Sequence, residues 1–172
     1  MFYNTSLESF SGDLSSLVNG YKMFYGTSIA SFSGDLSRLV NSHEMFKFTE
    51  LTSFSSDSSG SPVNLSSLVN GYFMFGNSYL KSFSGDLSNL VNGDGMFYHT
   101  SLTSFSSDLS SLVYGDSMFS STSLTSFSSD LSSLLDGSYM FSSTSLNEKS
   151  IQNIANTIRD ISKLDKNNGN IW

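Results

Sequence analysis

The residue pair Met-Phe recurs along this chain at a nearly constant interval. The sequence contains 7 Met, and each is followed by Phe, beginning at Met1, Met23, Met45, Met74, Met96, Met118 and Met140. The intervals are 22, 22, 29, 22, 22 and 22 residues. A fixed period of this size is typical of repeat proteins, in which each repeat is one supersecondary unit stacked on its neighbours. The period constrains the architecture of the chain much more than its function.

Within each repeat, the apolar residues occupy the same places. If Met is position 1, they fall at positions 1, 2, 7, 10, 14, 17 and 18. Stacked repeats place like residues over one another, about 4.8 Å apart where they pair as strands, so these positions predict buried ladders. The spacing is neither strictly alternating nor helical, which favours short strands over 6–10 and 15–18 and their equivalents. Asn19-Gly20 and the equivalent pairs predict turns in which Gly supplies a positive φ.

The sequence predicts a mainly β fold: a β-solenoid of about six to seven coils over residues 1–146. The third repeat carries extra residues at 58–64, among them the only Pro of the chain, and these predict an insertion loop. Met1 begins inside the repeat frame without a preceding cap. We therefore expect the uncapped N-terminal coil to contact a partner or further repeats.

The residues after the last repeat predict an α-helix. Ser145 and Glu148 match a capping box, and Asn147 is the rival N-cap. Isoleucines then follow at steps of three and four, at Ile151, Ile154, Ile158 and Ile161. This pattern predicts a capping helix over 147–166 that lays its Ile face on the end of the stack, followed by a tail at 167–172.

Composition argues against several classes of partner. The net charge of −7 disfavours nucleic acid and anionic membrane surfaces. No apolar run approaches the roughly 20 residues of a membrane helix, and no basic-then-apolar leader follows Met1, so we expect neither membrane insertion nor a signal peptide in this sequence. The chain has no Cys, which rules out disulfides and thiolate metal sites. We expect no cofactor.

The repeat resembles the BspA-like bacterial surface leucine-rich repeat family. The resemblance is carried by Thr122-Ser123-Leu124-Thr125-Ser126-Phe127, then Leu131 and Leu134, a Gly-containing turn at Gly137, and Met140-Phe141. The Met-Phe variant is also similar to the surface repeats of mycoplasma-type lipoproteins. The resemblance implies a secreted or cell-surface protein used for adhesion or protein binding, with a phage particle as the alternative location.

Two kinds of polar residue recur and raise the question of chemistry. One Asp per complete repeat could bind Ca²⁺ between coils or accept hydrogen bonds within its own turn: Asp13, Asp35, Asp57, Asp86, Asp108 and Asp130. We favour the turn. Ser is abundant, but the 2 His, His43 and His99, lie at unmatched positions and outside any nucleophile-elbow motif. We therefore expect that the protein is not an enzyme and has no catalytic residues.

The positions that vary between repeats are the best candidates for a binding surface. Aromatic residues gather at positions 3, 4 and 19–22, on both sides of Met-Phe: Tyr3, Tyr21, Tyr25, Phe48, Tyr72, Phe73, Tyr98, Tyr114 and Tyr139. Aromatic rings with a polar tip suit recognition of proteins or glycans. The alternative is that these rings only stack on one another. The sequence thus predicts a non-catalytic binding or adhesion protein; the alternative is a structural spacer or receptor-binding part of a larger surface or phage protein.

Overall fold

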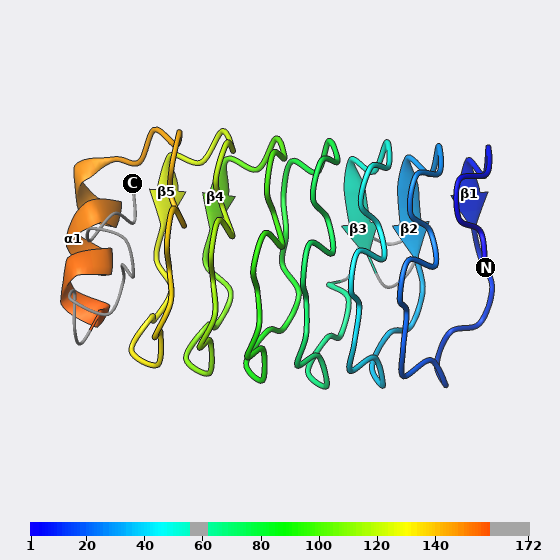
Figure 1. The fold of residues 1–172 in the computed structure, drawn as a ribbon, viewed down its shortest axis with the longest axis horizontal. Helices are drawn as coiled ribbons and strands as arrows, with labels where there is room; N and C mark the ends of the chain where they lie inside the picture. The colour runs from blue at the N-terminus through cyan, green and yellow to red at the C-terminus, as the bar shows by residue number, and fades with distance from the viewer. Residues whose placement is uncertain (56–61, 159–172) are drawn as a thin grey trace.

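A computed structural model of the chain describes residues 1–55 and 62–158, and the statements below concern those residues. The repeats lie one behind another along the long axis of the molecule, with the N-terminus at one end and helix α1 (Glu148–Thr157) at the other (Figure 1). The fold is mainly β with one helix in the described part of the chain, as the sequence predicts at this level.

The strands are short and pair in parallel between successive repeats. β1 (Ser9–Phe10), β2 (Ser31–Ser33) and β3 (Ser53–Ser55) form one sheet, and β4 (Ser104–Phe105) and β5 (Ser126–Phe127) form another. The register matches like with like, as in Phe10 with Phe32 and Phe105 with Phe127. The strand predicted over 6–10 is therefore shorter than expected. The strand predicted over 15–18 is absent from the described repeats, where single parallel bridges join the residues at position 19 instead.

Each Met-Phe pair lies in a run of tight turns that also pairs with the next repeat. Phe24 N–H donates to the carbonyl of Met45 and Gly26 N–H to that of Lys47, both at 2.9 Å. Positive φ angles occur at position 4 and at the last position of the repeat, in residues as varied as Phe48 (57°), Tyr139 (56°) and Ser121 (59°). These residues stand third in their turns, where a positive φ is the mark of a type II turn.

The prediction that the Asn-Gly pairs supply this positive φ is therefore wrong. Gly20 is needed for space: a Cβ atom there would lie 2.5 Å from Sδ of Met45, the first residue of the third repeat. Asn19 holds the turn from its side chain, because its Oδ1 accepts the N–H of Tyr21 at 3.0 Å.

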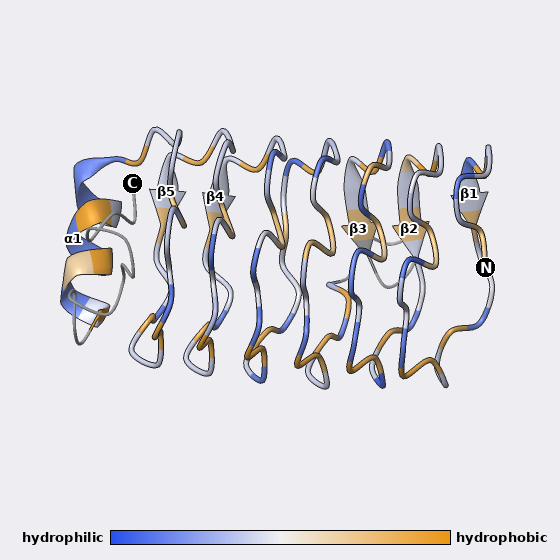
Figure 2. Ribbon diagram, in the orientation of Figure 1, coloured by the Kyte–Doolittle hydropathy of each residue, from blue (hydrophilic) through white to orange (hydrophobic). Residues whose placement is uncertain are grey.

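The core consists of two interleaved ladders of Phe rings with Leu and Met around them. Within the first ladder, Phe97 stacks on Phe119 with ring centroids 5.5 Å apart and planes 6° apart. Rings of the second ladder meet them edge-on, as Phe83 meets Phe97 at 5.0 Å. Figure 2 shows the hydrophobic residues recurring at the same level in successive repeats. The ladders predicted from positions 1, 2, 7, 10, 14 and 17 are confirmed for most of their members from the second repeat onwards. Met23, Phe54, Phe83 and Leu146 are only partly buried, and in the first repeat Met1 is exposed.

The apolar residue at position 18 is not part of the core. Val18, Val40, Val69 and Leu135 are between 39% and 49% exposed. The chain is extended here, so successive side chains point in opposite directions. Leu17 and its equivalents face the core, and their neighbours at position 18 therefore face outwards. The prediction of a buried ladder at position 18 is wrong.

Part of the predicted insertion loop lies outside the described residues, namely 58–61, together with Asp57. On the described side, Val63 is buried and Asn64 Oδ1 accepts the N–H of Ser66 at 2.9 Å. This is the hydrogen bond that Asp makes in the other repeats. The repeat frame therefore resumes at Asn64, one residue before the predicted Leu65.

Helix α1 covers the last repeat with only part of the predicted Ile face, in which Ile158 is partly buried against the core. Its N-cap is Asn147, whose Oδ1 accepts the N–H of Ser150 at 2.9 Å. The prediction of a capping box that begins at Ser145 is therefore wrong, and the rival N-cap is confirmed. Ile154 is buried, whereas Ile151 is 43% exposed. The helix ends at Thr157 and Ile158 is extended, short of the predicted residue 166; Ile161 and the tail lie outside the described residues.

Candidate binding surfaces

Most of the predicted aromatic residues form a connected row along one edge of the first five repeats. Tyr3 stacks on Tyr25 with centroids 5.0 Å apart, and Tyr25 meets Phe48 at 5.5 Å. A second run passes through Tyr21, His43, Tyr72, Phe73 and Tyr98, with successive centroids 5.1, 4.6, 4.9 and 5.7 Å apart. We call these residues the aromatic edge: Tyr3, Tyr21, Tyr25, His43, Phe48, Tyr72, Phe73 and Tyr98.

Two of the predicted binding residues do not belong to the aromatic edge. Tyr114 and Tyr139 lie in later repeats, are 45% and 47% exposed, and make no ring contact with the other aromatics among the described residues. Tyr114 takes the place of Asn at position 19 and pairs with Asn92 and Asp136 through its backbone. The residues predicted as a binding surface therefore make ring contacts with one another only within the first five repeats.

A buried carboxylate ties the two aromatic runs together. Glu44 is 9% exposed and forms two ion pairs: its Oε2 lies 3.0 Å from Lys22 Nζ, and its Oε1 lies 2.6 Å from Lys47 Nζ. Lys47 Nζ also lies 4.2 Å from the ring centroid of Phe73, and Lys22 Nζ lies 5.2 Å from that of Tyr25, distances at which a cation attracts an aromatic face. The aromatic edge is thus held by charges as well as by ring stacking.

The same contacts set the ionisation of this cluster. Burial opposes the charge on Glu44, but the hydrogen bonds from Lys47 and Lys22 outweigh burial and lower its pKa. The Glu44 hydrogen bond raises the pKa of Lys22. Burial lowers the pKa of His43 despite the neighbouring Glu44, since Lys22 and Lys47 also disfavour its protonation. Glu44 therefore carries its charge across the neutral range, paired with both lysines.

In the later repeats, Asp and Ser replace most of the aromatic rings at this edge, and only the separate rings of Tyr114 and Tyr139 remain. Asp94 Oδ1 accepts the N–H of Asp116 from the next repeat at 2.8 Å, and Asp116 Oδ1 accepts the hydroxyl of Ser117 at 2.6 Å. Burial raises the pKa of Asp94, and the nearby charges of Asp116 and Asp136 act in the same direction. The edge therefore changes along the stack from aromatic and cationic to small and acidic.

The repeated Asp outside this edge acts as a turn acceptor. Asp13, Asp35, Asp86, Asp108 and Asp130 each accept the N–H of the residue two positions on, at 2.8 to 3.0 Å. The hydrogen bond from Ser15 lowers the pKa of Asp13. Residues 1–55 and 62–158 contain no group of three or more His, Asp or Glu side chains placed to hold a metal ion. This arrangement favours the turn over Ca²⁺; Asp57 lies outside the described residues.

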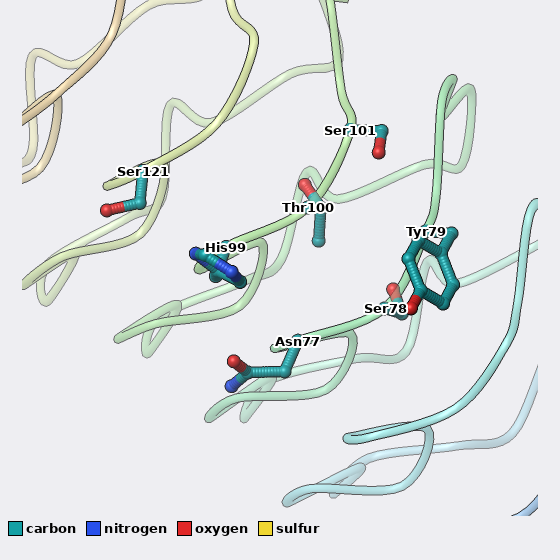
Figure 3. A pocket seen from close by; sticks show the side chains of 7 residues that line it. All are labelled: Asn77, Ser78, Tyr79, His99, Thr100, Ser101 and Ser121. Atoms are coloured by element: carbon teal, nitrogen blue, oxygen red, sulfur yellow. The ribbon is translucent and has the colours of Figure 1, made fainter.

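A hollow that the sequence analysis did not predict opens beside repeats four to six. It has a volume of about 330 Å³ and is lined by Asn77, Ser78, Tyr79, His99, Thr100, Ser101 and Ser121 (Figure 3). Asn77, His99 and Ser121 come from position 4 of three successive repeats, and each backbone N–H is hydrogen-bonded to the next repeat at 2.8 to 2.9 Å. The bases of these side chains are therefore fixed by the stack.

Ser78 is the unusual residue of this hollow. Position 5 is Thr in the other repeats, and its hydroxyl donates to the carbonyl of position 2, as in Thr100 to Phe97 (3.0 Å) and Thr122 to Phe119 (2.8 Å). Ser78 is 2% exposed, yet its hydroxyl has no hydrogen-bond partner among the described residues. An unpaired buried hydroxyl is costly, by about 1–3 kcal/mol.

The sequence does contain a signal for this hollow. Ser78 is the one Ser at a position otherwise occupied by Thr, and Tyr79 is the one aromatic residue at position 6. Both departures fall in the same repeat and in adjacent residues. The predicted site used only the most frequent aromatic positions, 3–4 and 19–22, and therefore did not include Ser78 or Tyr79.

Comparison with known proteins finds no matching family model, no matching curated protein and no matching solved structure. Within the described residues, no helix has the length and apolar character needed to cross a membrane. The surfaces of the chain itself are therefore the basis for its function.

Proposed function

We propose that this chain is a non-catalytic repeat protein that binds a protein partner through the aromatic edge. The observation that carries the proposal is the gathering of rings from four of the first five repeats on one side, with Tyr3, Tyr21 and Phe48 between 49% and 56% exposed. Aromatic residues dominate the binding energy of protein interfaces because each offers a large contact area with few rotatable bonds. A glycan ligand for the same edge is the alternative left by the sequence.

The Glu44 cluster supports this proposal. Stacked rings and ion pairs hold the aromatic edge in one arrangement before a partner arrives. Binding then costs less ordering entropy than it would for a free loop. Lys22 remains partly exposed beside the rings, with a side-chain exposure of 29%. An acidic group on a partner therefore has a cation within reach at the centre of the edge.

The proposal also covers the type of repeat and the location of the protein. We interpret the stack as a leucine-rich-repeat-like solenoid with a C-terminal capping helix, supported by its parallel register and by Leu at positions 7, 14 and 17. The resemblance to BspA-like repeats supports adhesion at a bacterial surface, with a phage particle as the alternative location. No cofactor and no catalytic residue are part of this proposal.

A second candidate function, a structural spacer, is favoured by the apolar face of the first repeat. Met1 is 89% exposed, and Phe2, Leu7 and Phe10 are only partly buried against the core. A partner that packs on this face would bury these apolar residues, which is the contact expected for a spacer.

The experiment is a selection of peptides displayed on phage from a random library, with the immobilised wild-type chain as bait. The counter-selection uses the triple variant Tyr3→Ser, Tyr25→Ser, Tyr98→Ser. Ser120 and Ser142 occupy the same position in later repeats, so the fold accepts Ser there. We expect enriched peptides that bind the wild type and lose binding to the triple variant. Failure to enrich any peptide, or equal binding to both baits, would overturn the proposal. The structural spacer would then be the remaining candidate function.

A further inference from the structure

We infer that the hollow beside Tyr79 is a binding site for a neutral sugar ring. This site lies outside the residues that define the aromatic edge, so it goes beyond the proposed function and does not depend on it.

The lining offers the groups that a sugar needs and lacks those that other ligands need. It consists of hydroxyl, amide and imidazole side chains together with one phenol ring, and contains no Lys, Arg, Asp or Glu and no aliphatic side chain. A neutral ligand rich in hydroxyls can donate to and accept from such groups. Without cations the hollow does not suit phosphate, and without aliphatic walls it does not suit a lipid chain.

Tyr79 supplies the apolar contact. Its side chain is 61% exposed and borders the hollow beside Ser78 (Figure 3). One face of a sugar ring presents C–H groups, which pack on an aromatic ring while the hydroxyls at the rim form hydrogen bonds. A volume of about 330 Å³ is at the lower end of the range for ligand pockets, which suits one sugar ring better than an extended ligand.

Ser78 explains why this repeat differs from the others. With Thr at position 5, the hydroxyl is tied to the backbone and the extra methyl occupies space. In repeat four the methyl is missing and the hydroxyl is buried without a partner. A ligand hydroxyl that reaches Ser78 satisfies this group, so the free energy lost by leaving it unpaired is recovered on binding.

The polar groups are already in place for a ligand. Asn77 and His99 hold positive φ angles of 57° and 54°, and the stack fixes their backbones by hydrogen bonds to the next repeat. The backbone that carries these side chains therefore needs no further ordering when a ligand binds. The neighbouring Tyr98 ring lies 6.1 Å from that of His99, so the aromatic edge ends where the hollow begins.

The test is saturation-transfer NMR with the full chain and four probes: the methyl glycosides of glucose, galactose, mannose and N-acetylglucosamine. We expect at least one to receive saturation and to shift the ring signals of Tyr79 and His99. Ser78→Thr and Tyr79→Ser should each weaken that binding by about tenfold or more, which is about 1.4 kcal/mol. Both variants install residues found at the same position of other repeats, Thr100 and Ser101, so the fold accepts them.

Two controls separate this site from other effects. Thr122→Ser makes the reverse exchange at position 5 two repeats away, and Tyr139→Ser removes a Tyr outside the hollow; neither should change glycoside binding. If no methyl glycoside binds, or if binding survives both Ser78→Thr and Tyr79→Ser, the inference is overturned. Peptides selected on the aromatic edge should bind Ser78→Thr normally, so failure of the sugar site is distinguishable from failure of the proposed function.

Discussion

Ser150 joins helix α1 to the last strand, and its replacement by Ala tests how the stack is capped. Its hydroxyl oxygen accepts the N–H of Phe127 at 2.8 Å, while its own hydrogen goes to Asn147 Oδ1 at 2.9 Å. Ser150 is 2% exposed. In Ser150→Ala the Phe127 N–H loses its acceptor and water cannot replace it. Edge groups of this kind must be satisfied wherever a sheet edge is covered.

The magnitude follows from these contacts. A buried N–H without a partner costs about 1–3 kcal/mol, and the better helix propensity of Ala returns roughly 0.5 kcal/mol. The net loss is therefore roughly 0.5–2.5 kcal/mol, a factor of about 2–70 in the local opening equilibrium. Hydrogen exchange of the Phe127 amide, followed by NMR, measures that equilibrium directly. Urea unfolding followed by circular dichroism gives the effect on the whole stack.

Two matched variants decide whether α1 is seated as described. Ile154→Ala removes a buried side chain and should cost about 2–5 kcal/mol, whereas Ile151→Ala, at a side chain 43% exposed, should stay within about 0.5 kcal/mol. The reasoning is refuted if Phe127 exchanges at the wild-type rate in Ser150→Ala, or if Ile151→Ala destabilises the protein more than Ile154→Ala.

The remaining stability predictions use urea unfolding. Phe97→Ala should cost about 3–5 kcal/mol because the ring is fully buried in the core. Val69→Ala, at an exposed position 18, should change stability by less than about 0.5 kcal/mol. Equal losses would contradict the finding that Phe97 faces the core and Val69 faces outwards. Glu44→Gln should destabilise by about 1 kcal/mol at neutral pH. Because the folded pKa of Glu44 lies below its ordinary value of 4.5, the stability it contributes is present above that value and is lost as the pH falls through the folded pKa. The gap between wild type and variant should close on acidification, and a gap independent of pH would count against the ion pairs. Gly71→Val should destabilise by about 1–3 kcal/mol, since its Cβ would lie 2.9 Å from Met96 Sδ; an unchanged unfolding midpoint would show that the turn has room.

The sequence predicts the stack well where identical residues repeat. The invariant Phe at positions 2 and 10 and the Leu at 14 and 17 define the core, because a ladder of like residues has no other stable place. The prediction of a buried residue at position 18 is wrong because Val there is as apolar as Leu at position 17. Only the extended backbone determines that Leu68 faces the core and Val69 faces outwards.

The turns could not be predicted from residue type. Positive φ angles fall on Lys22, Glu44, Phe48 and Tyr139, which are not residues that favour that region. The hydrogen bonds between successive repeats fix these backbones, so the stack overrides local preference. Gly20 was a misleading indication of positive φ, because the absence of a Cβ atom there leaves space for the side chain of Met45 from the third repeat.

The candidate surfaces were predicted in part. The aromatic positions 3–4 and 21–22 identified the edge, but the sequence could not show that Glu44 and its lysines bind the rings together, nor that Tyr114 and Tyr139 stand apart. The hollow depends on a missing methyl group at Ser78 and on side chains from three repeats, so its existence follows only from the stacked arrangement.

The most direct measurement of the central claim is the affinity of one selected peptide, determined by isothermal titration calorimetry for three proteins. These are the wild type, the triple variant Tyr3→Ser, Tyr25→Ser, Tyr98→Ser, and the control Tyr139→Ser. Binding through the aromatic edge predicts a Kd at least about thirtyfold higher for the triple variant, which corresponds to about 2 kcal/mol, and an unchanged Kd for the control. A triple variant that binds as tightly as the wild type, or a control that loses binding equally, would contradict the claim.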